Sequence, residues 1–334
     1  MIKDKIAGTL YGMAIGDALG MPSELWNRTR VKDFFGRIET FLDGPQENGA
    51  AKYFRLGQFT DDTSQALILL DSLFENDFIP DQHIVANKLI DWAYSIDAFS
   101  KNILGPSSKA ALTAIKNKQD PEPFTSTALT NGAAMRIAPI GCLFSPQEKE
   151  EMKHLIVKLS KATHSTDVAL GGAAMIATAV SAAIADYGWN EIMAEAISIY
   201  SLVAKEGAET FSASLIERLK LGIKLADQYK EDEEEFTQKI YDLVGAGTMT
   251  SESVPAALAI AYFAKDPVRC ALLCANLGGD TDTIGAMATA ICGAKNGFKS
   301  LDPSWVRVID KNNEVSLQTY VKRIVEYITK KGKG

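Results

Sequence analysis

Cysteine is scarce in this chain, and the scarcity excludes one class of protein. Its 334 residues include four cysteines: Cys142, Cys270, Cys274 and Cys292. Four scattered cysteines are too few for the disulfide framework of a small secreted protein. Cys270 and Cys274 share a helical face, but no nearby histidine or second cysteine pair completes a tetrahedral metal site. We therefore expect buried, reduced thiols in a cytoplasmic protein.

Strand signals are also missing. No run alternates over six residues with β-branched or aromatic enrichment, and no repeat period or low-complexity tract interrupts the chain. Helical periodicity recurs instead, for example at Leu67, Leu70 and Leu73. Small side chains, which let helices pack closely, dominate residues 168–185, 254–264 and 283–294. We predict an all-α fold with these segments at its centre, and a single domain over residues 1–334 because no long polar linker divides the chain.

An excess of positive charge is absent as well. The chain has 35 basic and 42 acidic residues, a net charge of −7, which argues against a nucleic-acid partner. Residues 168–185 carry no charge and are about long enough to cross a bilayer. Small residues dominate them, however, and no aromatic or basic belt flanks them, so we expect a core helix and no membrane partner. Asp4 and Asp17 argue against an N-terminal signal peptide.

Two acidic, threonine-rich stretches stand out: "FTDDT" at 59–63 and "GGDTDTIG" at 278–285. Each precedes an apolar helical segment, so helix capping explains either one alone. Capping needs one side-chain oxygen, however, and each stretch supplies three or four. If the two helix N-termini converge, four carboxylates and several hydroxyls meet without a thiolate or imidazole. Such oxygen ligands favour Mg²⁺, Mn²⁺ or Ca²⁺, and two ions balance the charge better than one. A two-metal site would activate water or orient a polar substrate.

Five motifs in order along the chain carry a resemblance: "GDALG", "FTDDT", "NGAAMR", "THS" and "NLGGDTDT". With these motifs, residues from about 5 to 297 resemble the ADP-ribosylglycohydrolase family. The amino-acid sequence around the motifs is similar to the bacterial YegU-type branch of that family. The resemblance implies a compact orthogonal helical bundle that holds two Mg²⁺ or Mn²⁺ ions. The implied metal ligands are Thr60, Asp61, Asp62, Asp280, Asp282 and Thr283. Thr281 would be a spacer, and Asp17 would be structural, capping or bonding a neighbouring loop.

The same resemblance implies residues around the substrate. Glu24, in "GDALGMPSE", matches a glutamate near the metals and the scissile ribose, with a proposed role in proton transfer or substrate gating. The segment "TNGAAMR" begins with small residues, and the sequence predicts a helix N-terminus there, which attracts anions. The family binds a diphosphate at this segment. Further implied substrate contacts are Asn131, Gly132, Ala133, His164, Gly105 and Ser107.

The sequence thus predicts a metal-dependent hydrolase that cleaves the glycosidic bond of an ADP-ribosyl or ribosyl conjugate, small or protein-linked. Glu24, Asp62 and Asp282 are the expected catalytic residues. Two alternatives remain open. The same site would act on a nucleoside or another sugar metabolite, or the chain would be a non-catalytic ADP-ribose-binding module. We expect a monomer or a small homo-oligomer.

Overall fold

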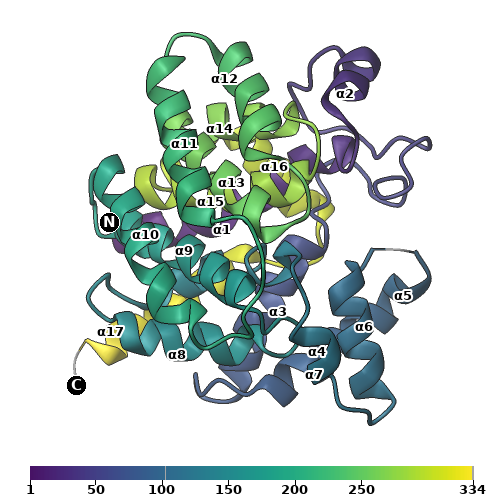
Figure 1. Cartoon of the computed structure of the whole chain (residues 1–334), viewed down its shortest axis with the longest axis vertical. Coiled ribbons are helices and arrows are strands. Elements are labelled where there is room, and N and C mark those ends of the chain that lie inside the picture. The colour runs from purple at the N-terminus through teal and green to yellow at the C-terminus, as the bar shows by residue number, and fades with distance from the viewer. Residues whose placement is uncertain (102, 333–334) are drawn as a thin grey trace.

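Two helices, α1 (Ile2–Gly20) and α15 (Thr281–Asn296), pack against each other through glycine in the middle of the molecule (Figure 1). The glycines of α1 recur every fourth residue, so they share one face of the helix: Gly8, Gly12, Gly16 and Gly20. Each of them lies against a backbone carbonyl of α15, and a Cβ at any of the four would collide with that carbonyl. In the same order, the carbonyls belong to Gly293, Thr289, Gly285 and Thr281. The two backbones therefore touch, and α1 and α15 share the most extensive contact between helices.

The structure, a computed structural model, describes residues 1–101 and 103–332. Around the central pair lie α9 (Asp167–Ile184), α13 (Thr250–Ala264) and α14 (Pro267–Ala275). The other α-helices are α2 (Arg28–Phe35), α3 (Asp61–Glu75), α4 (Gln82–Ser95), α5 (Ala98–Lys101), α6 (Pro106–Lys116), α7 (Glu122–Thr125), α8 (Lys149–Ser160), α10 (Trp189–Ala204), α11 (Leu215–Gln228), α12 (Glu233–Lys239), α16 (Pro303–Asn312) and α17 (Leu317–Lys331). Short 3₁₀ or π turns are η1 (Met21–Ser23), η2 (Asn131–Ala133), η3 (Ala138–Leu143), η4 (Ile240–Val244) and η5 (Phe298–Ser300).

The prediction of an all-α fold is confirmed. Across the described residues the chain forms helices joined by loops, and extended pairing is limited to single bridges. Two of these bridges, Trp26 with Gly279 and Thr130 with Met249, hold loops together. The predicted Ala-rich centre is also observed, because α9, α13 and α15 are almost entirely buried. Helix α9 is long and apolar enough to span a membrane, yet 89% of it is buried inside the structure.

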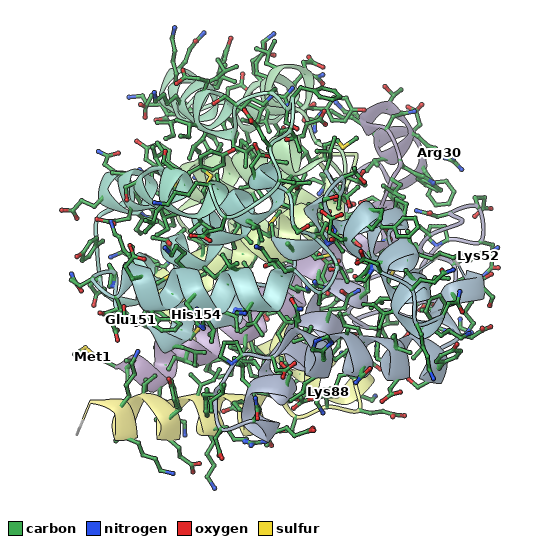
Figure 2. All side chains as sticks on the ribbon, turned by 60° about the horizontal axis from the view of Figure 1, so that its bottom comes forward. Met1, Arg30, Lys52, Lys88, Glu151 and His154 are labelled. Carbon is green, nitrogen blue, oxygen red and sulfur yellow. The ribbon has the colours of Figure 1, made fainter. Side chains whose placement is uncertain are left out.

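Helices α4 to α7 form a group at the lower right of Figure 1, away from α11 and α12 at the top. The loop between α2 and α3 reaches this group, because the ammonium groups of Lys52 and Lys101 lie 5.0 and 5.9 Å from the ring centre of Tyr53. In Figure 2, Lys52 and Arg30 lie toward the same edge of the molecule. The central helices and α6 of this group both contribute residues to one cavity, which is described in the next subsection.

Candidate functional site

Asp17 links the central helix pair to the start of α3. Its carboxylate is fully buried and accepts hydrogen bonds from the backbone N–H of Thr60 at 2.8 Å and of Thr63 at 3.0 Å. The Thr63 hydroxyl donates a third bond at 2.6 Å. Free N–H groups at a helix N-terminus need such acceptors. Asp17 thus has the structural bonding that the sequence suggested, and it fixes where the first acidic stretch lies.

The two acidic stretches converge, as the sequence predicted. The hydroxyl of Thr60 lies 3.1 Å from an oxygen of Asp62 and 3.4 Å from an oxygen of Asp282. Side-chain oxygens of Asp17, Asp62 and Asp282 lie within 4.8 Å of one another, and so do those of Glu24, Asp280 and Asp282. Asp282 therefore belongs to both groups of carboxylates.

Two oxygens in this cluster are without a partner. Asp62 Oδ1 and Asp282 Oδ1 are buried and accept no hydrogen bond from the described part of the chain. Buried polar atoms are normally satisfied, and an unsatisfied buried carboxylate oxygen is costly. Its presence on both stretches fits a positively charged ligand between α3 and α15. Thr281, by contrast, donates to the carbonyl of Gly20 at 2.8 Å, so its hydroxyl is turned elsewhere as expected.

A tight turn brings Glu24 to the same cluster. Gly278 and Gly279 have φ of +83° and +85°, values that favour glycine. The N–H of Leu25 donates to the carbonyl of Gly279, and the N–H of Gly279 donates to the carbonyl of Trp26, both at 2.7 Å. This pairing places Glu24 beside Asp280. Asp280 in turn accepts a hydrogen bond from the side-chain amide of Asn131 at 2.5 Å.

Burial and mutual repulsion raise the pKa values of these carboxyl groups. Burial raises the pKa of Asp17 and of Asp280 to about 6. Burial and the charge of Asp17 raise the pKa of Asp61 to about 7. Burial, followed by the charges of neighbouring carboxylates, also raises the pKa well above its usual range in Glu24, Asp62 and Asp282. Without a cation the cluster therefore favours protons, and a divalent ion would replace them.

A cavity of about 410 Å³ opens beside the cluster. Nine predicted site residues line it: Glu24, Asp61, Asp62, Gly105, Asn131, Gly132, Asp280, Asp282 and Thr283. Four others do not, namely Thr60, Ser107, Ala133 and His164. Thr60 lies between Asp62 and Asp282, while Ala133 is fully buried. Ser107 accepts a hydrogen bond from Thr130 at 3.0 Å. Residues that the sequence did not single out also line the cavity, among them Ser108 and Lys109.

The loop that starts at Asn131 differs from the prediction. Residues Asn131–Ala133 form one 3₁₀ turn, so the predicted helix N-terminus is wrong and its dipole does not supply an anion site there. The chain turns again at Ala138–Leu143, and Pro139 lies in this second turn, where proline disfavours a continuous α-helix. Asn131 instead bonds to Asp280 and to the hydroxyl of Ser253, which ties the loop to the acidic cluster.

His164 supports this loop from behind. A Cβ on Gly132 would lie 2.6 Å from His164 Cε1, so glycine is needed where the loop crosses the imidazole. The ring nitrogens lie 3.1 Å from the Thr130 hydroxyl and 2.8 Å from the Thr163 hydroxyl. Burial, together with the positive charge of Arg136, lowers the pKa of His164 to about 3. His164 is therefore neutral, and its ring lies directly behind the loop that lines the cavity.

Arg136 connects this wall to α3. Its guanidinium, 1% exposed, donates to Gln65 at 2.7 Å and to the hydroxyl of Thr163 at 2.6 Å. Gln65 donates to Asp61 at 3.0 Å. These hydrogen bonds connect Arg136 through Gln65 to Asp61 and orient its carboxylate. Arg136 thus links the loop at residues 131–136 to α3.

Comparisons with known proteins show similarity over almost the whole chain. The family model for ADP-ribosylglycohydrolase matches residues 1–333. "Uncharacterized protein YegU" from Escherichia coli (strain K12) is 46% identical over 328 residues, which cover 98% of either chain. "ADP-ribosylarginine hydrolase Tri1" from Pseudomonas putida (strain GB-1) is 28% identical over 321 residues, covering 92% of this chain and 74% of that protein.

More distant relatives cover nearly the whole chain too. "ADP-ribosylhydrolase ARH3" from Homo sapiens is 24% identical over 347 residues, covering 94% of this chain and 91% of that protein. A solved structure titled "ADP-ribosylglycohydrolase-related protein complex" has a TM-score of 0.68 at 21% identity and 98% coverage of both chains, a likeness of fold. The prediction of a glycosyl-bond hydrolase is confirmed at this level. The chain belongs to the ADP-ribosylglycohydrolase family.

Proposed function

We propose that this protein hydrolyses the glycosidic bond of an ADP-ribosyl or ribosyl conjugate with the help of two Mg²⁺ or Mn²⁺ ions. The observation that carries the proposal is the pair of unpartnered, buried oxygens on Asp62 and Asp282. Asp62 and Asp282 lie in the first turns of α3 and α15, 220 positions apart in sequence, and side-chain oxygens of the two lie within 4.8 Å of each other. The names of the relatives Tri1 and ARH3 support the substrate class.

The residues present fit a pair of hard divalent ions. All the proposed donors are oxygens, and no thiolate or imidazole lies among the described residues that line the cavity, which suits Mg²⁺ or Mn²⁺. The proposed ligands are Thr60, Asp61, Asp62, Asp280, Asp282 and Thr283. Because Asp282 belongs to both groups of converging carboxylates, it would help to hold the ions wherever they bind in the cluster.

When bound, the ions would neutralise the carboxylates, polarise a ribose hydroxyl and supply an activated water. The chain's own groups do the rest. Glu24 lines the cavity beside Asp280 and Asp282, so its carboxyl group is placed to deliver a proton to the leaving group or to take one from water. Asn131 holds Asp280 in place. Apolar side chains of Leu25, Ile103 and Met135 restrict water around the bond.

We propose that fewer residues touch the substrate directly than the sequence predicted. Gly105, Asn131 and Gly132 line the cavity and are proposed to touch the substrate. His164, Ala133 and Ser107 are proposed to shape the wall from behind. Catalytic roles are proposed for Glu24, Asp62 and Asp282.

The deciding experiment measures release of ADP-ribose from ADP-ribosylated arginine and serine peptides, and of base from nucleosides. Each assay is run with Mg²⁺, with Mn²⁺ and with a chelator. We expect metal-dependent turnover that is lost in Asp282→Asn and retained in Asp91→Asn, a matched change at an exposed position of α4. Full activity in Asp282→Asn would contradict the two-metal site.

The same assay separates the alternatives. If only nucleosides are hydrolysed, the substrate of the site is a neutral metabolite. Tight binding of ADP-ribose without turnover of any conjugate would assign a binding module. Glu24→Gln is expected to lower turnover at least ~100-fold, the usual contribution of a general acid or base, while leaving metal binding in place.

We also propose a single cytoplasmic domain over residues 1–334, acting as a monomer or small homo-oligomer. One continuous cluster of buried apolar side chains, from Ile6 to Ile324, supports the single domain. The net charge of −7 supports the absence of a nucleic-acid partner. Limited proteolysis and sedimentation of the purified protein test the domain and the oligomeric state.

A further inference from the structure

The loop between η4 and α13, residues 245–249, links two parts of the candidate site. The backbone carbonyl of Ala246 accepts a hydrogen bond from the N–H of Asp280 at 2.7 Å, and that of Thr248 accepts one from the N–H of Asn131 at 3.0 Å. Asp280 immediately precedes α15, and its carboxylate accepts the side-chain bond from Asn131. Thr248 itself lines the cavity. The position of this loop therefore sets how Asp280 and Asn131 lie relative to each other.

Glu252 holds this loop, although it is not one of the residues that line the cavity. Its carboxylate accepts a hydrogen bond from the N–H of Gly247 at 2.9 Å. A Cβ on Gly245 would lie 2.7 Å from the carboxyl carbon of Glu252, and a Cβ on Gly247 would lie 2.8 Å from a carboxylate oxygen. The backbone of the loop therefore wraps closely around this carboxylate. Glycine gives a backbone more freedom than other residues do, so a loop with two glycines needs an anchor of this kind.

The anchor stands on a rigid support. Glu252 belongs to the first turn of α13, a helix that is almost entirely buried. Arg218 of α11 donates to the carbonyl of Ser251 at 2.8 Å, and its guanidinium lies 3.9 Å from the Glu252 carboxylate. Groups that hold metal ligands in place from outside the site matter for binding, because their removal lowers metal affinity or activity roughly 10- to 100-fold.

We propose that Glu252 is a positioning residue of the candidate site. By anchoring residues 245–249 it keeps Asp280 and Asn131 in the arrangement that metal binding and turnover require. Glu252 touches neither substrate nor ions, and it acts through the backbone carbonyls of Ala246 and Thr248. The inference rests on the proposed function and extends the machinery of that function to a residue outside the cavity.

Calorimetric titration with Mn²⁺ tests this role, together with kcat and KM for the conjugate that the wild type hydrolyses fastest. Glu252→Ala removes the acceptor for the N–H of Gly247, so we expect Mn²⁺ binding and kcat each to fall roughly tenfold while KM changes little. Glu252→Gln keeps a side-chain oxygen that accepts the same hydrogen bond, and it should retain most of both. Glu151→Ala, the same change at an exposed position of α8, should match the wild type.

Gly247→Ala approaches the same contact from the loop and leaves Glu252 in place. Its Cβ would push against the carboxylate oxygen, so this variant should also weaken Mn²⁺ binding. Combined with Glu252→Ala it should add little, because the group it collides with is then absent. Fully additive losses would show that the two positions act independently and would overturn the inference.

The Tm in chelator separates positioning from folding. A Glu252→Ala variant that loses stability in chelator but keeps the Mn²⁺ affinity and kcat of the wild type would make Glu252 a structural residue only and overturn the inference. Equal losses in Glu252→Gln and Glu252→Ala would also overturn it, because the hydrogen bond would then not be the cause. A wild type that neither binds Mn²⁺ nor hydrolyses any conjugate would refute the proposed function and this inference together. Wild-type turnover that survives unchanged in Glu252→Ala would refute this inference alone.

Discussion

The hydroxyl of Thr60 lies 3.4 Å from a carboxylate oxygen of Asp282, a residue 222 positions further along the chain. This contact joins the N-terminus of α3 to that of α15. Positive helix ends favour nearby anions, so each helix lowers the cost of holding its own carboxylates. Burial, followed by the charges of neighbouring carboxylates, still raises the pKa values of Asp62 and Asp282, and a bound cation would oppose both effects.

Divalent ions should stabilise the folded protein. An ion that binds the native state alone adds about 2.7 kcal/mol at a hundredfold excess over its Kd. We expect Mg²⁺ or Mn²⁺ to raise the Tm of the wild type, measured by calorimetry, and chelator to lower it. Asp282→Asn should lose this response, while Asp91→Asn should retain it. An equal metal response in both variants would place the ions elsewhere.

The stability of the metal-free protein should depend on pH. The pKa values of Asp17 and Asp280 are raised to about 6 and that of Asp61 to about 7. A carboxyl group with a raised pKa binds more protons when folded, so its stabilisation is present at low pH and is lost as pH rises through the folded pKa. In chelator, this contribution declines from about pH 4 to about pH 7.

Metal should oppose this decline, because it binds the ionised carboxylates. The measurement is urea unfolding between about pH 5 and pH 7.5, with and without Mg²⁺. We expect the gap between the two free energies of unfolding to widen as pH rises. Titratable groups remote from the cluster affect both free energies equally, so they do not change the gap between them. A constant gap would mean that the ions do not compete with protons on these carboxyl groups.

Two glycines of the cavity wall should respond differently to alanine. A Cβ on Gly132 would meet the ring of His164 at 2.6 Å, whereas one on Gly105 would meet nothing within 4 Å. Gly132→Ala should therefore cost about 1–3 kcal/mol of unfolding free energy, as overpacking does. Gly105→Ala should change it little. Adding His164→Ala should recover part of the loss in the Gly132 variant, and no recovery would show that another contact causes it.

Gly16→Ala tests the glycine contact between α1 and α15. A Cβ there would collide with the carbonyl of Gly285, and backbone cannot move aside as a flexible side chain can. We expect a loss of about 3 kcal/mol or more, together with a weaker metal response. Gly49→Ala, where nothing lies within 4 Å, is the control. A neutral Gly16→Ala would show that the two helices can separate without loss.

The sequence predicted the acidic cluster well because each stretch combines several oxygen ligands with a local helix-start signal. It also predicted the Ala-rich centre, but it did not include α1, whose glycines recur every fourth residue. The helix at residue 131 was wrong, because Asn131 bonds to Asp280 and Ser253 and the chain turns there instead. Ser108 and Lys109 were missed since the face that α6 presents depends on tertiary packing. The substrate contact predicted for His164 stays a prediction, since the ring lies behind the loop at Gly132.

Backbone contact along α1 and α15 has a consequence for how the carboxylates are spaced. Asp17 belongs to α1, and Asp280 and Asp282 begin α15, so their separation is set by two main chains in contact and not by adjustable side chains. A frame of this kind cannot spread when like charges push against it. The folded core therefore fixes the spacing of the carboxylates without any ion, so the proposed ions would require little reorganisation on binding.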